Sequence, residues 1–379
     1  MRIGIDCRLW NETGVGRYTR NLVTNLARLD KKNDYVLFAK SEDEKAIKSV
    51  VSGQWSVVTT DVSWHGLQEQ IRLPKILNDQ NLDLMHFPYL SVPIFYNKPY
   101  VVTVHDLIIN RFATGRASTL PLPVYFAKRV GYHAVLANAV YRSKKIIVPS
   151  NAVKTDLLRT YRNVSSDKVE VTYEGGFDIE IKNKKLNIKD ENKELVEGKY
   201  LIRVGNFYPH KNVERLLLAF HDFVYSDYDN HAIKLVLVGK RDYFSKRIEK
   251  QIELLNMSSN VVFYENAKDV DLISLYQNAI ATIIPSFAEG FSLTAVESMS
   301  LGTPVVASDI PVHREICGSA AIYCNPADIN DMNQKINFAC SLVEDSRKEL
   351  IEQGKKQAKN FSWRKMAEDT LKIYNSITP

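Results

Sequence analysis

The sequence predicts an α/β fold with two doubly wound parallel sheets. Short, continuously apolar runs alternate with longer amphipathic runs, a pattern typical of parallel strands joined by crossover helices. The alternation occurs as two successive series, and 379 residues exceed the length of one typical hydrophobic core. We therefore expect two Rossmann-like domains, over residues 1–177 and 200–360, with ligands bound in a cleft beyond the carboxyl ends of their strands.

The first series contains apolar runs without polar alternation, as expected for strands covered by helices on both faces. The predicted strands are Arg2–Cys7, Tyr35–Ala39, Trp55–Thr59, Leu84–Phe87, Tyr100–His105, Lys145–Pro149 and Val169–Tyr173. Periodic segments between them predict helices at 17–30, 66–79, 120–142 and 151–161. Ser150 and Asn151 are expected to cap the last of these helices.

The second series follows residues 178–199, which are rich in Lys, Glu and Asn and are expected to form a charged surface excursion near the domain boundary. The predicted strands are Tyr200–Gly205, Lys234–Gly239, Val261–Glu265, Ala281–Ser286, Pro304–Ser308 and Ala320–Cys324. Helices are predicted at 211–224, 243–256, 268–278, 292–301 and 328–358. The final segment, 361–379, has helical spacing with Ser362 as a cap, and can cross back to the N-terminal domain.

Composition narrows the possible partners. The 50 basic and 44 acidic residues give a net charge of +6, too small an excess to indicate nucleic acid but compatible with anionic substrates or an anionic membrane surface. The four cysteines lack the spacing of a zinc site or a disulfide framework. No apolar segment resembles a signal peptide or is long enough to cross a bilayer, so a cytoplasmic location is expected.

The most informative stretch is 286–308, where an apolar strand leads through a glycine turn into a short helix. The first turn of such a helix presents free N–H groups and a partial positive charge, which suit a diphosphate; the amides of Ser292, Leu293 and Thr294 are the candidates. Glu289 precedes the helix and Glu297 lies within its second turn. Their carboxylates can accept paired hydrogen bonds from sugar hydroxyls.

The pattern Glu-Gly-Phe-x-x-x-x-x-Glu, followed by Ser-x-x-x-Gly-x-Pro-Val-Val-Ala-Ser, resembles the donor-site signature of family-four retaining glycosyltransferases with the GT-B fold. The resemblance implies that Glu289 contacts hydroxyls of the transferred sugar, with the amides of Gly290 and Phe291 nearby. It also implies that Glu297 holds the ribose of the nucleotide. The resemblance extends over nearly the whole chain, and is strongest over 200–325.

A second motif, ending Pro-His-Lys-Asn, resembles the turn after the first strand of the family's C-terminal domain and implies Lys211 as a diphosphate ligand. A fixed cation there stabilises the charge that develops on the departing nucleoside diphosphate. Many relatives have an arginine where this chain has Asn206, within the donor site. His210, Arg203 or Arg17 could supply the missing cationic contact, and the sequence does not choose among them.

The N-terminal segment 11–19 follows the first strand and contains Gly14 and Gly16. A dinucleotide fingerprint would need a third glycine at Thr19 and an acidic residue near Lys40, so a dehydrogenase is disfavoured. The segment instead resembles the family's glycine loop, which would place Gly14, Gly16 and Arg17 near the donor phosphates and the acceptor. A tight strand-to-helix turn explains the glycines equally well.

The segment Thr-Val-His-Asp-Leu resembles the family's His-Asp turn, which implies that His105 borders the reacting sugar. Asp227-x-Asp229 has the form of a metal-nucleotide motif from a different fold, but it lies in a polar loop, and we expect no metal or other cofactor. The mixed aromatic and basic segment 123–145 suits either a domain helix or a helix at an anionic membrane surface.

The resemblance implies a metal-independent retaining hexosyltransferase that uses a nucleotide sugar as donor. The resemblance favours GDP-mannose as donor, a glycan or polyprenyl-diphosphate-linked oligosaccharide as acceptor, and a role in bacterial surface polysaccharide or O-antigen synthesis. It implies front-face attack, with the leaving phosphate assisting deprotonation of the acceptor. The alternatives are a UDP-sugar-dependent transferase (glucose, galactose or N-acetylglucosamine), a nucleotide-sugar 2-epimerase of the same architecture, and a non-catalytic nucleotide-sugar-binding protein.

Overall fold

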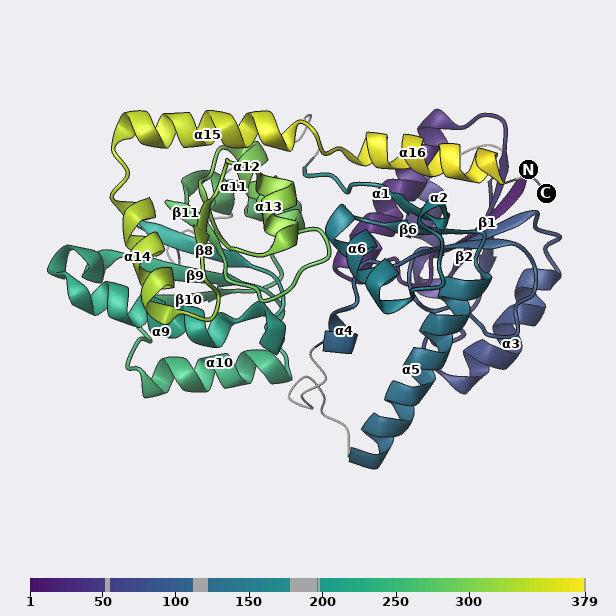
Figure 1. The fold of residues 1–379 in the computed structure, drawn as a ribbon, viewed down its shortest axis with the longest axis horizontal. Coiled ribbons are helices and arrows are strands. Elements are labelled where there is room, and N and C mark those ends of the chain that lie inside the picture. The colour runs from purple at the N-terminus through teal and green to yellow at the C-terminus, as the bar shows by residue number, and fades with distance from the viewer. Residues whose placement is uncertain (52–54, 112–121, 178–195, 197, 378–379) are drawn as a thin grey trace. The chain divides into compact units, whose positions relative to one another are not determined.

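The computed structural model describes residues 1–51, 55–111, 122–177, 196 and 198–377, which form two compact units (Figure 1). Unit 1 comprises Met1–Leu107, Ser118–Glu174 and Ser362–Pro379, and unit 2 comprises Ile108–Ala117 and Gly175–Phe361. Apart from the segment that begins at Ile108, the chain leaves unit 1 after Glu174 and returns to it at Ser362. The charged excursion expected at 178–199 lies mostly outside the described residues.

Unit 1 is built around a seven-stranded sheet in the order β3-β2-β1-β4-β5-β6-β7, and every neighbouring pair is parallel. The strands are β1 (Arg2–Asp6), β2 (Asp34–Ala39), β3 (Ser56–Thr59), β4 (Leu84–Phe87), β5 (Tyr100–Thr103), β6 (Lys145–Val148) and β7 (Val169–Val171). The central strands β4 and β5 are buried along their whole length, which explains their continuously apolar sequence.

Helices connect these strands. They are α1 (Gly14–Leu29), α2 (Glu44–Val50), α3 (Leu67–Asn78), α5 (Leu122–Arg142), α6 (Asn151–Thr160) and, at the C-terminus, α16 (Trp363–Ser376), with the short α4 (Ile108–Arg111) between β5 and α5. The hydroxyl of Ser150 accepts from the amide of Val153 and that of Ser362 from the amide of Lys365, so both predicted helix starts are confirmed. Helix α16 packs against α1, and Tyr374 bonds the buried ring of His86 at 2.5 Å.

Unit 2 contains a six-stranded parallel sheet in the order β10-β9-β8-β11-β12-β13. Its strands are β8 (Tyr200–Val204), β9 (Lys234–Val238), β10 (Val261–Tyr264), β11 (Ala281–Ile284), β12 (Val305–Ser308) and β13 (Ile322–Cys324). Alternate residues of β8 face two different cores, with Leu201 packed in one and Ile202 in the other. This double burial is what the continuous apolar runs predicted.

The helices of unit 2 are α9 (Val213–Ser226), α10 (Tyr243–Leu254), α11 (Asp269–Asn278), α12 (Leu293–Leu301), α13 (Pro311–Cys317), α14 (Ile329–Cys340) and α15 (Glu344–Ala358). The prediction of one helix over 328–358 is wrong, because the chain breaks at Ser341–Val343 and begins a second helix at Glu344. Helix α13 was missed, since its seven residues are too few to show a helical period. A predicted helix over 243–256 ends earlier, and Asn256 adopts a positive φ of 55°.

Both sheets reverse strand order beside their first strand, between β1 and β4 in unit 1 and between β8 and β11 in unit 2. In doubly wound sheets, ligands bind beyond the carboxyl ends of the strands at such a reversal. Ligands are therefore expected beside the loops after these strands in each unit.

Candidate active site

The loop after β11 in unit 2 carries the predicted donor motif. Ser292 adopts a left-handed conformation (φ 76°, ψ 56°) directly before α12, and Gly302 ends that helix at φ 82°. The first-turn amides of Leu293 and Thr294 have no carbonyl partner within the helix, and the helix dipole adds a partial positive charge there. The hydroxyl oxygen of Ser292 is buried and has no hydrogen-bond partner among the residues that the structure describes. The geometry of this helix start is compatible with an anionic oxygen, and its binding of phosphate stays a prediction.

Glu289 and Lys211 form an ion pair within this loop region. The Lys211 ammonium nitrogen lies 2.7 Å from Glu289 Oε2, and the Ser286 hydroxyl donates to Glu289 Oε1 at 2.7 Å. Their side chains are 18% and 13% exposed, so the pair is largely shielded but reachable from solvent. Burial would raise the pKa of Glu289, but the charge of Lys211, together with His313 and Ser286, outweighs it and lowers the pKa to about 2.

Asn212 holds together the two loops that carry this pair. It adopts a left-handed conformation (φ 60°, ψ 28°) between the short 3₁₀ turn Pro209–Lys211 and α9. Its side-chain amide donates to the carbonyls of Pro285 (2.9 Å) and Pro326 (2.8 Å). The Phe287 amide also donates to the carbonyl of His210 at 2.8 Å. These bonds explain how residues 78 positions apart come into contact.

Glu297 lies in the second turn of α12, as predicted, and is buried, with 2% of the residue accessible. The Tyr276 hydroxyl donates to Glu297 Oε2 at 3.3 Å. Phe291, also in the motif, is buried against Phe361, with ring centroids 5.5 Å apart. Glu289 and Glu297 therefore differ in environment. Glu289 pairs with a lysine ammonium, and Glu297 pairs with a tyrosine hydroxyl.

In unit 1, the predicted glycine segment begins α1. The helix starts at Gly14, three residues earlier than expected, so Gly14, Gly16 and Arg17 lie in its first turn rather than in a loop before it. A Cβ atom on Gly16 would lie 2.6 Å from the carbonyl oxygen of Trp10 and 2.7 Å from that of Leu9. Gly16 is thus required because the preceding turn approaches the helix closely. The tight strand-to-helix turn that the sequence offered as an alternative therefore accounts for this glycine.

His105 follows β5 at the carboxyl edge of the same sheet. Its Nδ1 lies 3.2 Å from Glu174 Oε1, and its Nε2 lies 2.9 Å from the carbonyl oxygen of Pro88. Because both partners only accept hydrogen bonds, a ring that makes both carries two protons. Burial would lower the pKa of His105, but Glu174 outweighs it and raises the pKa above its ordinary value. Both contacts and the raised pKa favour the protonated ring of His105, which is a poor general base.

Comparisons with known proteins identify the chain. The family described as "Glycosyltransferase Family 4" matches residues 13–175, and the family described as "Glycosyl transferases group 1" matches residues 184–357. The chain belongs to the family-four glycosyltransferases. It is a hexosyltransferase with the GT-B fold, and the two parallel sheets are those of this fold.

Three similar proteins illustrate the match. The glycosyltransferase is 29% identical over 265 residues to the O-antigen chain mannosyltransferase RfbU of Salmonella typhimurium, which covers 70% of this chain and 67% of that protein. It is 25% identical over 383 residues to O-antigen chain mannosyltransferase B of Escherichia coli, with 96% of each chain covered. Its fold is similar to that of Anabaena HepE in complex with UDP-glucose (TM-score 0.74, 17% identity, 100% of both chains covered).

Two buried residues near the Lys211–Glu289 pair were not clearly predicted as site residues from the sequence of this glycosyltransferase. His313 in α13 is completely buried and shares electrostatic contact with Glu289 and Lys211. Its Nδ1 donates to the Ser308 carbonyl at 2.8 Å, and its Nε2 has no partner within the described part of the chain. No motif marks His313, because its proximity to Glu289 follows from the packing of α13 after β12 and not from spacing.

Arg203 is the second such residue. The sequence alone left it as one of three candidates for the missing cationic contact. It is 3% exposed near the end of β8, and its guanidinium donates to the main-chain carbonyls of Gly205 and Asn206. Its charge therefore lies against the backbone of Asn206. Burial lowers the pKa of Arg203 to about 10, while Glu289 raises it, so the side chain remains charged at neutral pH.

Proposed function

We propose that this glycosyltransferase transfers mannose from GDP-mannose, with retention of configuration, to a glycan or polyprenyl-diphosphate-linked oligosaccharide of a bacterial surface polysaccharide. The Lys211–Glu289 pair beside the start of α12 carries the proposal, because it sets a cation and a carboxylate next to free helix amides. A sugar diphosphate needs this combination: acceptors for its hydroxyls and positive charge for its phosphates. Two relatives named as O-antigen mannosyltransferases favour mannose.

The donor would lie along this cluster in a definite order. The Lys211 ammonium has three N–H donors and Glu289 takes one, which leaves donors for phosphate oxygens. Glu289 accepts one bond at each oxygen, and a carboxylate has about four acceptor positions, so it can also take two sugar hydroxyls. Glu297, farther along α12, would accept from the ribose. The helix amides would bind the phosphates between them.

Arg203 would supply the second positive charge for the diphosphate. Among the residues that the structure describes, no carboxylate lies within ion-pair distance of its buried guanidinium, and two of its five donors go to main-chain carbonyls. A buried cation without an anion is costly, and a bound diphosphate would compensate it.

Arg203→Met should weaken GDP binding, and adding Asn206→Arg should restore it. Arg247→Met, which removes an arginine paired with Glu214 at 2.8 Å, is the control. Equal affinity in Arg203→Met would assign the second contact elsewhere.

We propose front-face transfer without a metal ion. Glu289 is held as a carboxylate of low pKa by Lys211, so it is a weak base and serves as a binding group. The bond between the anomeric carbon and the leaving phosphate breaks as the acceptor oxygen attacks the same face. The acceptor proton passes to the leaving phosphate oxygen, so charge and protons balance. Lys211 and Arg203 stabilise the charge that develops on that oxygen. Full activity in excess EDTA is the expected result.

A donor panel tests the proposed function. GDP-mannose, UDP-glucose, UDP-galactose and UDP-N-acetylglucosamine are compared by nucleotide release, with and without saccharide acceptors. We expect release from GDP-mannose, and an α-linked mannoside as product in the proton NMR spectrum. Release from a UDP-sugar alone would correct the donor, a β-linked product would contradict retention, and conversion to a C2 epimer would indicate the epimerase alternative.

Peripheral membrane contact is part of the proposal. Val124, Phe126 and Val130 are 44%, 57% and 70% exposed on the first half of α5, and Lys128 is exposed beside them. The second half of the same helix is buried in the unit 1 core. In the described part of the chain, no helix is long and apolar enough to span a bilayer. Sedimentation with anionic vesicles should decrease in Phe126→Ser, and absence of sedimentation of the native chain at low salt would contradict membrane contact.

A further inference from the structure

Three aromatic side chains of unit 1 form a cluster that the donor motifs leave unexplained. The His65 ring contacts Trp64 and Tyr89 edge-on, with ring centroids 5.2 and 5.6 Å away. Trp64 is 36% exposed, His65 is exposed, and Tyr89 is half-buried. Each ring combines an apolar face with a polar group: an indole N–H, an imidazole nitrogen or a phenol. The exposed surface of the cluster is therefore partly apolar and partly polar.

The cluster continues toward His105. Tyr89 directly follows Pro88, whose carbonyl oxygen accepts from His105 Nε2 at 2.9 Å. On its other side, His105 contacts Tyr18 edge-on, with centroids 4.9 Å apart. Tyr89 and His105 therefore both lie at the carboxyl edge of the sheet, shortly after β4 and β5. Ligands of a doubly wound sheet bind at this edge.

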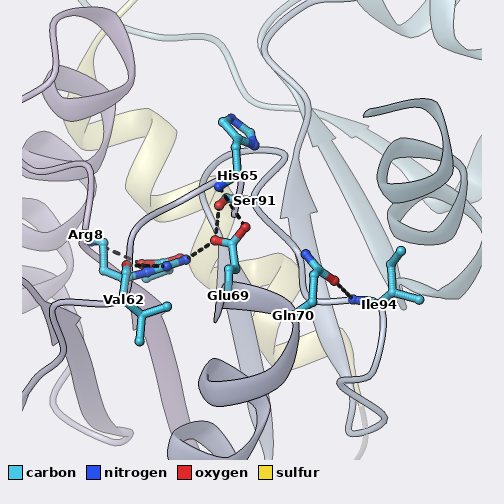
Figure 2. A network of polar contacts seen from close by, with 8 residues as sticks. Arg8, Val62, His65, Glu69, Gln70, Ser91 and Ile94 are labelled. Atoms are coloured by element: carbon cyan, nitrogen blue, oxygen red, sulfur yellow. Dashed lines mark hydrogen bonds and ion pairs between the residues drawn. The ribbon is translucent and has the colours of Figure 1, made fainter. Parts of the chain in front are cut away.

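The backbone of His65 is held in an uncommon conformation. Its φ of 58° lies in the left-handed region, which few residues other than glycine adopt. The His65 amide donates to Glu69 Oε2 at 3.0 Å, as Figure 2 shows. Such conformations persist only where the surroundings fix them, and they concentrate at binding sites.

A buried ionic network fixes this turn (Figure 2). Glu69 is 1% exposed and accepts from Arg8 Nη2 at 2.7 Å and from the Ser91 hydroxyl. Arg8, also 1% exposed, forms an ion pair with Asp6 at 2.7 Å and donates to the Val62 carbonyl at 3.1 Å. The network therefore bonds the backbone at both ends of the 62–65 turn. Burying three charges to hold an exposed turn gives no evident gain in core packing, but it preorganises the rings that the turn presents.

We propose that Trp64, His65 and Tyr89 form a saccharide-binding subsite that holds the acceptor glycan at the carboxyl edge of the unit 1 sheet. The ligand class follows from the surface: a sugar ring has an apolar C–H face that packs on an aromatic ring and hydroxyls that bond the adjacent polar groups. Partial desolvation of the ring lowers the pKa of His65 below its ordinary value, which favours the neutral imidazole and suits an uncharged ligand. The inference rests on the proposed function and specifies its acceptor side.

The test uses the full-length chain and α-linked mannotriose as probe, with binding measured by saturation-transfer NMR. Wild type should bind the probe, and Trp64→Ala should weaken binding by about 3- to 10-fold, the size of one aromatic contact. Tyr228→Ala removes an aromatic ring that is 84% exposed in unit 2, and is the matched control with unchanged binding.

His65→Gly and His65→Ala separate the ring from the backbone. Glycine removes the ring but tolerates the positive φ, so it should weaken mannotriose binding without lowering thermal stability; alanine should lower both. Binding that survives Trp64→Ala and His65→Gly overturns the subsite, as does failure of the wild type to bind mannotriose, maltotriose and a galactan trisaccharide. The affinity of the wild type for GDP-mannose is measured separately. If the wild type does not bind GDP-mannose, the proposed donor is refuted. If it binds GDP-mannose but no saccharide, only the subsite is refuted.

Discussion

Removal of the Lys211 ammonium should affect catalysis and stability together, because the same ion pair serves both. The pKa of Glu289 is about 2 instead of 4.5, a difference of about 2.5 units despite the opposing effect of burial. At about 1.4 kcal/mol per unit, the native surroundings stabilise this carboxylate by about 3 kcal/mol. Lys211 is the largest favourable contribution, so Lys211→Ala should lose a large part of that stabilisation.

The pH dependence of this loss has a defined sign. A carboxyl group whose pKa is lowered on folding contributes stability above its unfolded pKa of 4.5, and loses it as the pH falls toward 2. The difference in unfolding free energy between wild type and Lys211→Ala should therefore be constant from pH 5 to 7 and shrink below pH 4.5. Urea unfolding at a series of pH values measures it.

The rate effect follows from the charge lost opposite the leaving diphosphate. A charged hydrogen bond contributes about 1.5–3 kcal/mol, which corresponds to about a 10- to 100-fold decrease in turnover at subsaturating GDP-mannose. The matched control is Lys348→Ala, which breaks an exposed Lys–Glu pair at 3.4 Å and should change stability by less than about 1 kcal/mol and turnover not at all. Turnover of Lys211→Ala within twofold of wild type would remove this residue from the mechanism.

Three further variants test neighbouring parts of the account. Glu289→Gln should reduce the preference for GDP-mannose over GDP in calorimetric titrations by about 10-fold, since only the sugar contact is weakened; an unchanged preference would separate Glu289 from the sugar. Glu297→Ala should raise the Kd for GDP by about 10-fold or more, and equal affinity would show that the ribose binds elsewhere. Gly16→Ala would place a Cβ 2.6 and 2.7 Å from two main-chain oxygens and should lower the unfolding free energy by about 1–3 kcal/mol; an unshifted urea midpoint would show that the turn can relax.

Much of the fold could be predicted because buried parallel strands have a recognisable sequence. β4 was predicted with its observed ends, Leu84–Phe87, since all four residues are covered on both faces. Short helices such as α2 and α13 span seven residues each and show too little periodicity to stand out. The break between α14 and α15 was missed because the amphipathic pattern continues across it.

The candidate site was predictable only in part, because its residues come together through tertiary contacts that sequence spacing does not show. Glu289 and Lys211 came from motifs that resemble a known family, while their contact depends on Asn212 bonding a loop 73 positions away. Spacing along the chain cannot reveal such a contact. His313 is brought near Glu289 by the path of the chain after β12, and the turn at His65 depends on Arg8, 61 positions before its partner Glu69. Residues that act through tertiary contacts leave no local pattern.

A crystal structure of the full chain with GDP-mannose is the most direct test that unit 2 binds the donor through these residues. The account predicts phosphate oxygens within about 3 Å of the Lys211 ammonium and of the first amides of α12, mannose hydroxyls at Glu289 and the ribose at Glu297. A nucleotide bound elsewhere, with the Lys211–Glu289 pair untouched, would contradict it.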